Sequence, residues 1–253
     1  WIPARGSREL WELLQRRIER EVTTFKGLIP IWDVVNEVCV MPGYQRDQNP
    51  VARLCRRMGR VALVRGLFEK ARLVNQGACL ILNDYDVSDR YVRVIERCLE
   101  AGVKIDAIGI QSHMHTGWWG VDRLLKVCDR FARFGLPLHF TEMTILSGAL
   151  KTDHDWHSFH PGWDSTADGE ARQAREVEAT YRTLFGHRDV QAVTWWDFSD
   201  AKSWQGAPAG LLRKDLSPKP AYEVLVDLVH REWKTDLGEQ VTDEQACIRF
   251  TGF

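Results

Sequence analysis

Apolar and polar positions along the chain follow two periods, and the two periods alternate. Leucine and isoleucine recur at helical spacing over residues 7–22, which predicts an amphipathic helix with Ser7 as its N-cap. Short apolar runs beside Gly or Pro predict strands at Ile29–Val35, Cys79–Tyr85, Ile105–His113, Leu136–Met143 and Val190–Phe198. Further helices are predicted over Val51–Asn75, with a break near Gly59 or Gly66, and over Ser88–Glu100, Val121–Phe134, Glu170–Phe185 and Ala221–Trp233.

A regular alternation of strand and helix predicts an α/β fold with a parallel sheet covered by helices. Polar residues follow each predicted strand, at the edge where a (β/α)8 barrel assembles its chemistry. An open doubly wound sheet is the competing architecture, but no GxGxxG or Walker-type loop follows any strand. The barrel is favoured. A length of 253 residues suits a whole barrel, yet only five of its eight strands are evident.

Composition narrows the class of protein. With 44% apolar and 27% charged residues, the chain is that of an ordinary globular protein. A net charge of −1 argues against a nucleic-acid partner, and no apolar run is long enough to predict a membrane span. The basic run from Arg53 to Arg60 is interpreted as a solvated helix face. The 11 tryptophans, against 10 phenylalanines, suggest a site that stacks flat ligands, although buried core is the commoner role of tryptophan.

The cysteines and histidines do not predict a metal site. The six cysteines form no CxxC pair, and most are interpreted as small buried hydrophobes, with their disulfide status left open. His113 and His115, together with three histidines between residues 154 and 160, could bind zinc. The second group lies in a loop whose Trp156, Phe159 and Trp163 are better explained as a wall over a cleft or as mutual packing. We expect no metal and no cofactor.

Two glutamates end two different predicted strands, Glu37 in WDVVNE and Glu142 in LHFTEM. At a barrel mouth, burial and a second carboxylate separate the pKa values of such a pair, which is what glycoside hydrolysis requires. The alternative is structural, because strand-end carboxylates also cap helices or pair with arginine. The glutamates alone do not decide between these two interpretations.

The segments WDVVNE, LNDY, IGIQSHMH, LHFTEM, VTWWDFSDAKSW and LLRKDLSPKPAYEVL occur in this order. They resemble glycoside hydrolase family 10, the retaining endo-β-1,4-xylanases, from about Trp1 to Trp233. The resemblance implies a (β/α)8 barrel in which Glu37 is the acid/base after strand four and Glu142 the nucleophile after strand seven. It also implies roles in substrate binding for Asn36, Asn83, Tyr85, Gln111, His113, Trp196 and Trp204. In the family, the residue at Asn36 contacts the sugar 2-OH, the histidine at His113 orients the nucleophile, and the two tryptophans wall the cleaved sugar.

Two residues depart from the family pattern. Thr144 stands where the family has Asp, and Asp197 where it has Gly, so rate and subsite detail are open. Residues 1–3 align just after the third family strand, so we expect only barrel strands four to eight, without the sugar-binding residues of strands one to three. Such a partial barrel leaves strand edges without partners, which predicts self-association or a second polypeptide covering the open edge.

The sequence therefore predicts a partial barrel catalytic domain over residues 1–233 and a C-terminal extension, 234–253, that resembles the start of a β-rich module. The expected function is endo-acting hydrolysis of β-1,4-xylan or xylo-oligosaccharide, outside the cell as the family implies. Three alternatives stay open. They are a truncated carbohydrate-binding barrel that is weakly active or inactive, a β-1,4-glucan-active relative and a metal-dependent hydrolase.

Overall fold

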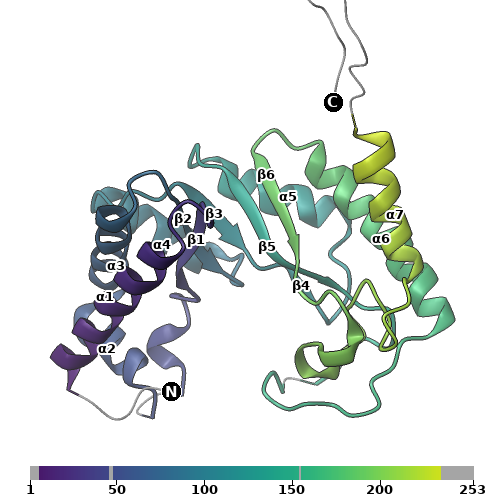
Figure 1. Ribbon diagram of the computed structural model, residues 1–253, viewed down its shortest axis with the longest axis horizontal. Coiled ribbons are helices and arrows are strands. Elements are labelled where there is room, and N and C mark those ends of the chain that lie inside the picture. Colours follow the sequence, from purple (N-terminus) through teal and green to yellow (C-terminus); the bar gives the residue numbers. More distant parts are fainter. Residues whose placement is uncertain (1–5, 46–47, 154, 235–253) are drawn as a thin grey trace, which may run out of the picture. The chain divides into compact units, whose positions relative to one another are not determined.

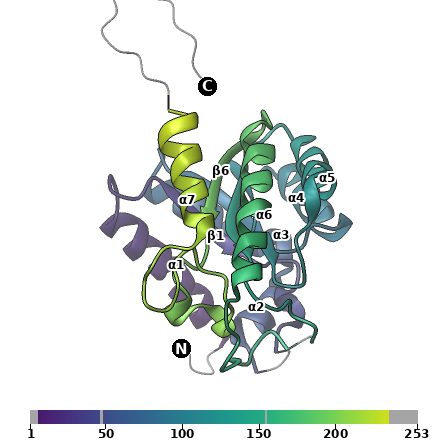
Figure 2. The same ribbon diagram turned by 90° about the vertical axis from the view of Figure 1, so that its right-hand side faces the viewer.

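A computed structural model describes residues 6–45, 48–153 and 155–234 (Figures 1 and 2). The α-helices are α1 (Ser7–Thr24), α2 (Pro50–Met58), α3 (Arg60–Val74), α4 (Asp89–Glu100), α5 (Gly120–Ala132), α6 (Ala167–Phe185) and α7 (Pro220–Asp227). The strands are β1 (Ile31–Asn36), β2 (Cys79–Asp84), β3 (Ala107–Ile110), β4 (His113–Met114), β5 (Leu138–Ile145) and β6 (Val190–Trp195). Short helical turns follow some of them, namely η1 (Met41–Gly43), η2 (Asp200–Lys202), η3 (Trp204–Gly206) and the π-helical η4 (Leu228–Glu232).

The five predicted strands are present; β1 and β5 end one or two residues later than predicted, whereas β2, β3 and β6 end earlier. β1, β2, β3, β5 and β6 pair in that order, and each pairing is parallel. The predicted strand over residues 105–113 divides into β3 and the two-residue β4, because Ser112 has a positive φ of 58° that interrupts extended backbone. A helix joins each parallel neighbour to the next, as a parallel sheet requires. Among the described residues, β1 pairs only with β2 and forms one end of this order.

The predicted helix over residues 51–75 is two helices, and Gly59 is the break between them. Gly59 has φ 84° and ψ 150°, a conformation open to glycine alone, and it ends α2 and precedes α3. Gly66 lies within α3 without a kink, where its missing side chain leaves room for the indole of Trp11 from α1. The prediction that Ser7 is the N-cap of α1 is wrong. Gly6 occupies the N-cap position, and no side chain caps this helix.

Two helix starts follow standard capping chemistry. The Asn49 side chain accepts hydrogen bonds from the amides of Val51 and Ala52, and Pro50 takes the first helical position of α2. Ser88 caps α4 by accepting from the Arg90 amide at 3.2 Å. Both caps fix where the helix begins after its loop.

The described chain forms two compact units. The first combines Trp1–His113, Val121–Met143 and Thr183–Trp196, and so contains the whole parallel ladder together with α1 to α4 (Figure 1). Its core is apolar and includes Leu80, Leu82, Ile108 and Phe140 from the strands. The buried Tyr91 of α4 donates its hydroxyl to the Leu82 carbonyl at 2.6 Å, so this helix is held directly on the sheet.

The second unit combines Met114–Gly120, Thr144–Arg182 and Asp197–Phe253. Here α6 and α7 run side by side (Figures 1 and 2), and Arg182 of α6 donates to Glu232 of η4 at 2.7 Å. A fully buried lysine, Lys219, pairs with the buried Asp200 at 2.7 Å and donates to the Ser147 hydroxyl at 2.8 Å. Because both charges are paired and hydrogen-bonded, their burial is tolerated.

The structure describes five of the six cysteines and none of the chain from residue 235 onward. Cys39, Cys55, Cys79, Cys98 and Cys128 are free thiols, and all but Cys79 are buried, as small hydrophobes are; Cys247 lies outside the described residues. The predicted C-terminal extension also lies outside them from residue 235 onward. None of the described helices combines the length and the apolar character that a bilayer crossing needs.

Candidate active site

The parallel register brings the ends of four strands to one edge of the first unit. Asn36 of β1 is the register partner of Asn83 of β2, and the Glu37 amide donates to the Asn83 carbonyl at 2.9 Å. The ladder continues through the amide of Gln111, which donates to Asp84, and the amide of Glu142, which donates to Gln111. Glu37, Asn83, Gln111 and Glu142 are therefore neighbours, because the backbone hydrogen bonds continue to the carboxyl ends of the strands.

Glu142 is held by two side chains, one on each carboxylate oxygen. Asn83 donates from Nδ2 to Oε1 at 3.0 Å, and His113 Nε2 lies 3.0 Å from Oε2. The Glu142 residue is only 8% exposed. Charge-assisted hydrogen bonds of this kind fix both the position and the orientation of a carboxylate. The resemblance implied that His113 orients the nucleophile; the structure gives its contact with Glu142, and the role itself stays a prediction.

Glu37 is joined to the same network through Gln111. The Gln111 side-chain amide donates to Glu37 Oε1 and to Asn36 Oδ1, each at 3.0 Å, and Asn36 in turn accepts from Asn83 at 3.0 Å. Glu37 has φ 57°, the left-handed region that costs a residue with a side chain free energy. The chain thus holds Glu37 in a strained turn directly after β1, as residues at functional sites often are.

Asn83 lies at the centre of this hydrogen-bond network. It is fully buried, and its amide group donates to Glu142, to Asn36 and, at 3.3 Å, to Asp33. Its Oδ1 accepts from the Thr141 hydroxyl at 2.7 Å. The Asn83 side chain therefore links Glu142, Asn36, Asp33 and Thr141. The role in substrate binding that the resemblance implied for Asn83 stays a prediction.

Gly109 of β3 makes room for Asn83. The two residues are register partners, and a methyl group on Gly109 would overlap the Asn83 amide oxygen and lie 2.9 Å from its Cγ. The backbone of Gly109 is not in the left-handed region, so the requirement for glycine here is one of space and not of conformation. The IGIQSH segment therefore contributes a glycine as well as Gln111 and His113.

Asp33 is a residue of this site that the sequence argument missed. Solvent reaches Asp33 on its side of β1, yet the surrounding protein atoms desolvate the carboxyl enough to raise its pKa to about 6, and the negative charge of Glu142 adds to this. The Asn83 amide donates to it at 3.3 Å. The signal in the sequence was a carboxylate inside an otherwise apolar strand, WDVVNE, four residues before Glu37.

Two aromatic residues of the first unit lie beside this network. Trp196 is 49% exposed and meets the His113 ring edge-on, with 6.0 Å between centroids and 82° between planes. Tyr85 is 45% exposed and follows Asp84 at the end of β2. Its pKa is raised, chiefly by desolvation and then by the charge of Asp84. Exposed rings with fixed neighbours suit the apolar faces of a sugar.

Trp204 belongs to the second unit, where it is part of an aromatic cluster. Trp156 stacks on it with centroids 6.0 Å apart and planes at 17°, and His115 meets it edge-on at 5.1 Å. Lys151 lies over the rings of Trp156 and Trp163 at 5.3 and 5.7 Å. Trp163 packs against the rings of His115 and His160. These observed ring partners are residues other than Trp156, Phe159 and Trp163 themselves, so both interpretations of the loop aromatics stay predictions.

The structure bears on Asp197, which departs from the family pattern, and on the histidines, which could have bound zinc. The Asp197 carboxylate accepts from the Trp204 amide at 3.1 Å, so this side chain ties down the turn that carries Trp204. Among the described residues, no group of three or more His, Cys, Asp or Glu is arranged to hold a metal ion; His154 lies outside them.

Comparisons with known proteins extend this picture. The sequence profile of Glycosyl hydrolase family 10 matches residues 1–228. Endo-1,4-beta-xylanase A of Caldicellulosiruptor sp. (strain Rt8B.4) is 30% identical over 230 residues, which is 86% of this chain and 31% of that protein. Endo-1,4-beta-xylanase B of Thermotoga neapolitana is 27% identical and is matched over 89% of this chain and 64% of its own length. The chain thus spans less than two thirds of these relatives.

The fold is similar to a solved structure of xylanase 10B from Thermotoga petrophila RKU-1 in complex with xylobiose. The TM-score is 0.71 at 25% identity, over 90% of this chain and 68% of that one. Parallel strands joined by helices, with carboxylates at the strand ends, define a protein of the (β/α)8-barrel class, here in partial form. Within that class, the chain belongs to glycosyl hydrolase family 10.

Proposed function

We propose that this chain hydrolyses β-1,4-xylan at internal linkages with retention of anomeric configuration. The observation that carries the proposal is the shared network of Glu37 and Glu142, which are joined through Gln111, Asn36 and Asn83 by hydrogen bonds of 3.0 Å. A pair of carboxyl groups fixed at one barrel edge is what glycoside hydrolysis needs. The names of the related xylanases support xylan as the substrate.

In the proposed mechanism, Glu142 is the nucleophile. Its carboxylate attacks the anomeric carbon while Glu37 gives its proton to the leaving oxygen, so the glycosidic bond breaks as the glycosyl–Glu142 ester forms. Glu37 then takes a proton from water, which attacks the anomeric carbon and releases Glu142. Two inversions give net retention. The hydrogen bonds from Asn83 and His113 keep the Glu142 oxygens in place for the attack.

The other predicted residues take supporting roles in this proposal. Asn36 is exposed beside Glu37 and offers an amide to a sugar hydroxyl, while Gln111 and His113 hold the two carboxylates. Trp196 and Tyr85 offer ring faces to the sugar. Because a polymeric substrate does not cross a membrane, we further propose that the chain acts outside the cell.

The test is release of reducing sugar from linear xylan by the purified chain and by Glu142→Gln and Glu37→Gln. We expect each substitution to lower the rate at least about a thousandfold, because the amide neither attacks nor transfers the proton. Glu100→Gln, an exposed position at the end of α4, is the matched control and should keep the wild-type rate. Equal rates for wild type and Glu142→Gln would reject hydrolysis and leave carbohydrate binding as the function.

The stereochemistry and the substrate need separate readouts. Proton NMR of the first product should show the β-anomer before mutarotation, and an initial α-anomer would reject Glu142 as nucleophile. Faster hydrolysis of β-1,4-glucan than of xylan would replace the proposed substrate and keep the mechanism. Loss of activity with a chelator would contradict the metal-free scheme.

A further inference from the structure

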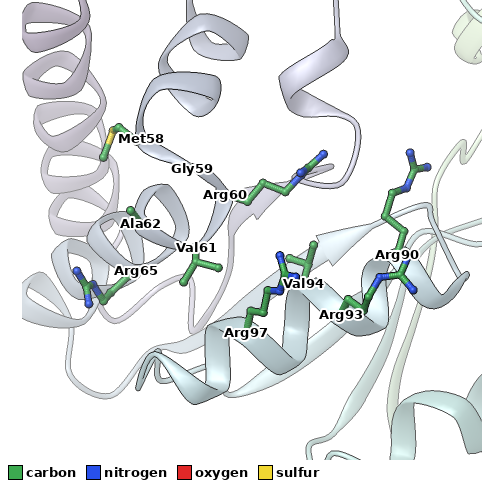
Figure 3. Close-up of a pocket in the computed structure, with 10 residues that line it drawn as sticks. All are labelled: Met58, Gly59, Arg60, Val61, Ala62, Arg65, Arg90, Arg93, Val94 and Arg97. Carbon is green, nitrogen blue, oxygen red and sulfur yellow. The ribbon is translucent and has the colours of Figure 1, made fainter.

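A basic groove lies on the first unit between α3 and α4, with a cavity volume of about 680 Å³ (Figure 3). Half of the ten residues that line the groove are arginines, and none is acidic. The arginines are Arg60, Arg65, Arg90, Arg93 and Arg97. The net charge of the whole chain is −1, so this concentration of positive charge is local to the groove. It creates a positive electrostatic potential in a concave site.

The two helices supply these arginines by their spacing. Arg90, Arg93 and Arg97 follow one another at i, i+3 and i+7, so they form a row of about 10 Å along one face of α4. Arg60 and Arg65 face the same groove from the first two turns of α3. The sequence interpretation of the Arg53 to Arg60 run as a solvated face is therefore wrong for Arg60, which is half-buried and lines the groove.

Charge within the groove is only partly neutralised by the protein. Arg90 pairs with the buried Asp86, and Arg65 Nε lies 3.9 Å from Glu69 Oε1. By contrast, Arg93 and Arg97 are exposed and have no hydrogen-bond or ion-pair partner among the described residues. Neighbouring like charges on a helix face disfavour each other, so an anion between them would remove this repulsion.

The groove touches the backbone of the candidate active site. Arg60 donates from Nε to the Val38 carbonyl at 3.0 Å and from Nη2 to the Cys39 carbonyl at 2.8 Å, and these residues directly follow Glu37. On the α4 side, Arg90 pairs with Asp86. The amide of Asp86 donates to the carboxylate of Asp84 at 3.0 Å, and Asp84 is the last residue of β2. A polymer held in the groove would therefore lie next to the loop that carries Glu37.

We propose that this groove binds the carboxylate groups of a uronic-acid-substituted β-1,4-xylan. The proposal rests on the proposed function, because it takes the occupant of the groove to be a further stretch of the same polysaccharide. The planar guanidinium fork matches a carboxylate with two parallel hydrogen bonds. Met58, Val61 and Val94 also line the groove, and these apolar side chains suit the C–H face of a sugar ring better than they suit an isolated phosphate.

Binding is measured by affinity electrophoresis and calorimetry with glucuronic-acid-substituted xylan, using Glu142→Gln so that the polymer stays intact. The comparison ligand is the same xylan after chemical reduction of its carboxyl groups to alcohols. We expect the reduced polymer to bind at least about tenfold more weakly, and higher salt to weaken binding of the acidic polymer only. Equal binding of the two polymers would overturn the proposal.

The groove itself is tested with Arg93→Gln/Arg97→Gln added to the same background. We expect about a tenfold loss of affinity for the acidic polymer. Arg57→Gln/Arg175→Gln removes the same charge from exposed positions outside the groove and should keep the affinity within about twofold. The single variant Arg93→Gln, with a smaller loss, guards against a folding defect, which circular dichroism would reveal.

Two outcomes separate this proposal from its alternatives. A single-stranded DNA oligonucleotide that binds more tightly than the acidic xylan, and loses affinity in Arg93→Gln/Arg97→Gln, would assign the groove to nucleic acid and overturn the proposal. If the wild-type chain fails to hydrolyse any xylan while the acidic polymer still binds through Arg93 and Arg97, the proposed hydrolysis fails and the groove stands.

Discussion

Asp33 and Glu142 are two carboxyl groups of one network that differ in their surroundings. Glu142 receives hydrogen bonds from Asn83 and His113, whereas Asp33 receives one longer bond from Asn83 and is desolvated without a cation beside it. The pKa of Asp33 is therefore raised to about 6. Protonation of Asp33 at mildly acidic pH removes a negative charge close to Glu142. The electrostatic environment of Glu142 therefore depends on pH through Asp33.

The raised pKa of Asp33 predicts a pH-dependent effect of Asp33→Asn on stability. In the folded state Asp33 keeps its proton up to about pH 6, while in the unfolded chain it loses it near pH 4. Since the native state binds more protons in that window, the Asp33 contribution falls as pH rises from about 4 to 6. Asp33→Asn should thus gain stability relative to wild type across that range, measured by urea unfolding at pH 4, 5, 6 and 7.

Asp122→Asn, at an exposed position on α5, is the control for this series. The difference in unfolding free energy between Asp122→Asn and wild type should not rise between pH 4 and 6, as that of Asp33→Asn does. A difference between Asp33→Asn and wild type that stays constant from pH 4 to 7 would contradict the assigned shift.

Gly109 predicts a second effect at the scale of a single methyl group. In Gly109→Ala the new Cβ overlaps the Asn83 amide, so Asn83 must move away from Glu142 and Asn36. We expect a loss of about 1–3 kcal/mol in unfolding free energy and a fall in kcat of about tenfold to a hundredfold. Gly43→Ala is the matched control, because its Cβ meets no atom within 4 Å and its φ is not positive. Wild-type kcat in Gly109→Ala would show that Asn83 does not position Glu142.

At the scale of elements, Gly59 separates two helices whose packing builds both the fold and the basic groove. α3 packs against α1, α2 and α4, and its direction depends on the turn at Gly59. Since φ 84° with ψ 150° is closed to residues with a side chain, Gly59→Ala should lower the unfolding free energy by about 1–3 kcal/mol. Urea unfolding measures this. A stability change as small as that of Gly43→Ala would mean that the turn relaxes without strain.

The sequence predicts the elements well because each strand is a short apolar run and each helix has one apolar face. It does not predict which side chains meet across strands. Asn83 belongs to the recognisable LNDY segment, yet its contact with Glu142 depends on the register with β1 and on the space that Gly109 leaves. Asp33 is visible in WDVVNE, but its pKa depends on atoms from several strands. The basic groove likewise requires α3 and α4 to pack together before Arg60 and Arg93 can face one cavity.

At the scale of the whole molecule, the described residues give the parallel ladder one end at β1. Ile31 is 43% exposed there, and Leu28 and Ile29, just before the strand, are exposed as well. An apolar strand with a free row of backbone donors and acceptors favours pairing with another chain. The expectation that a second copy covers this edge stays a prediction, and it concerns the first unit alone.

Sedimentation velocity over a series of concentrations tests that pairing. We expect the average mass of this chain to rise with concentration, and Ile29→Lys/Ile31→Lys to shift the rise to higher concentration, because lysine on an edge strand opposes pairing and removes exposed apolar surface. Lys substitutions at Leu125 and Val229, which are exposed apolar positions outside β1, are the matched control and should leave the association unchanged. A chain that stays monomeric at every concentration would reject pairing at β1. Equal association of the β1 variant and wild type would place the contact on another surface.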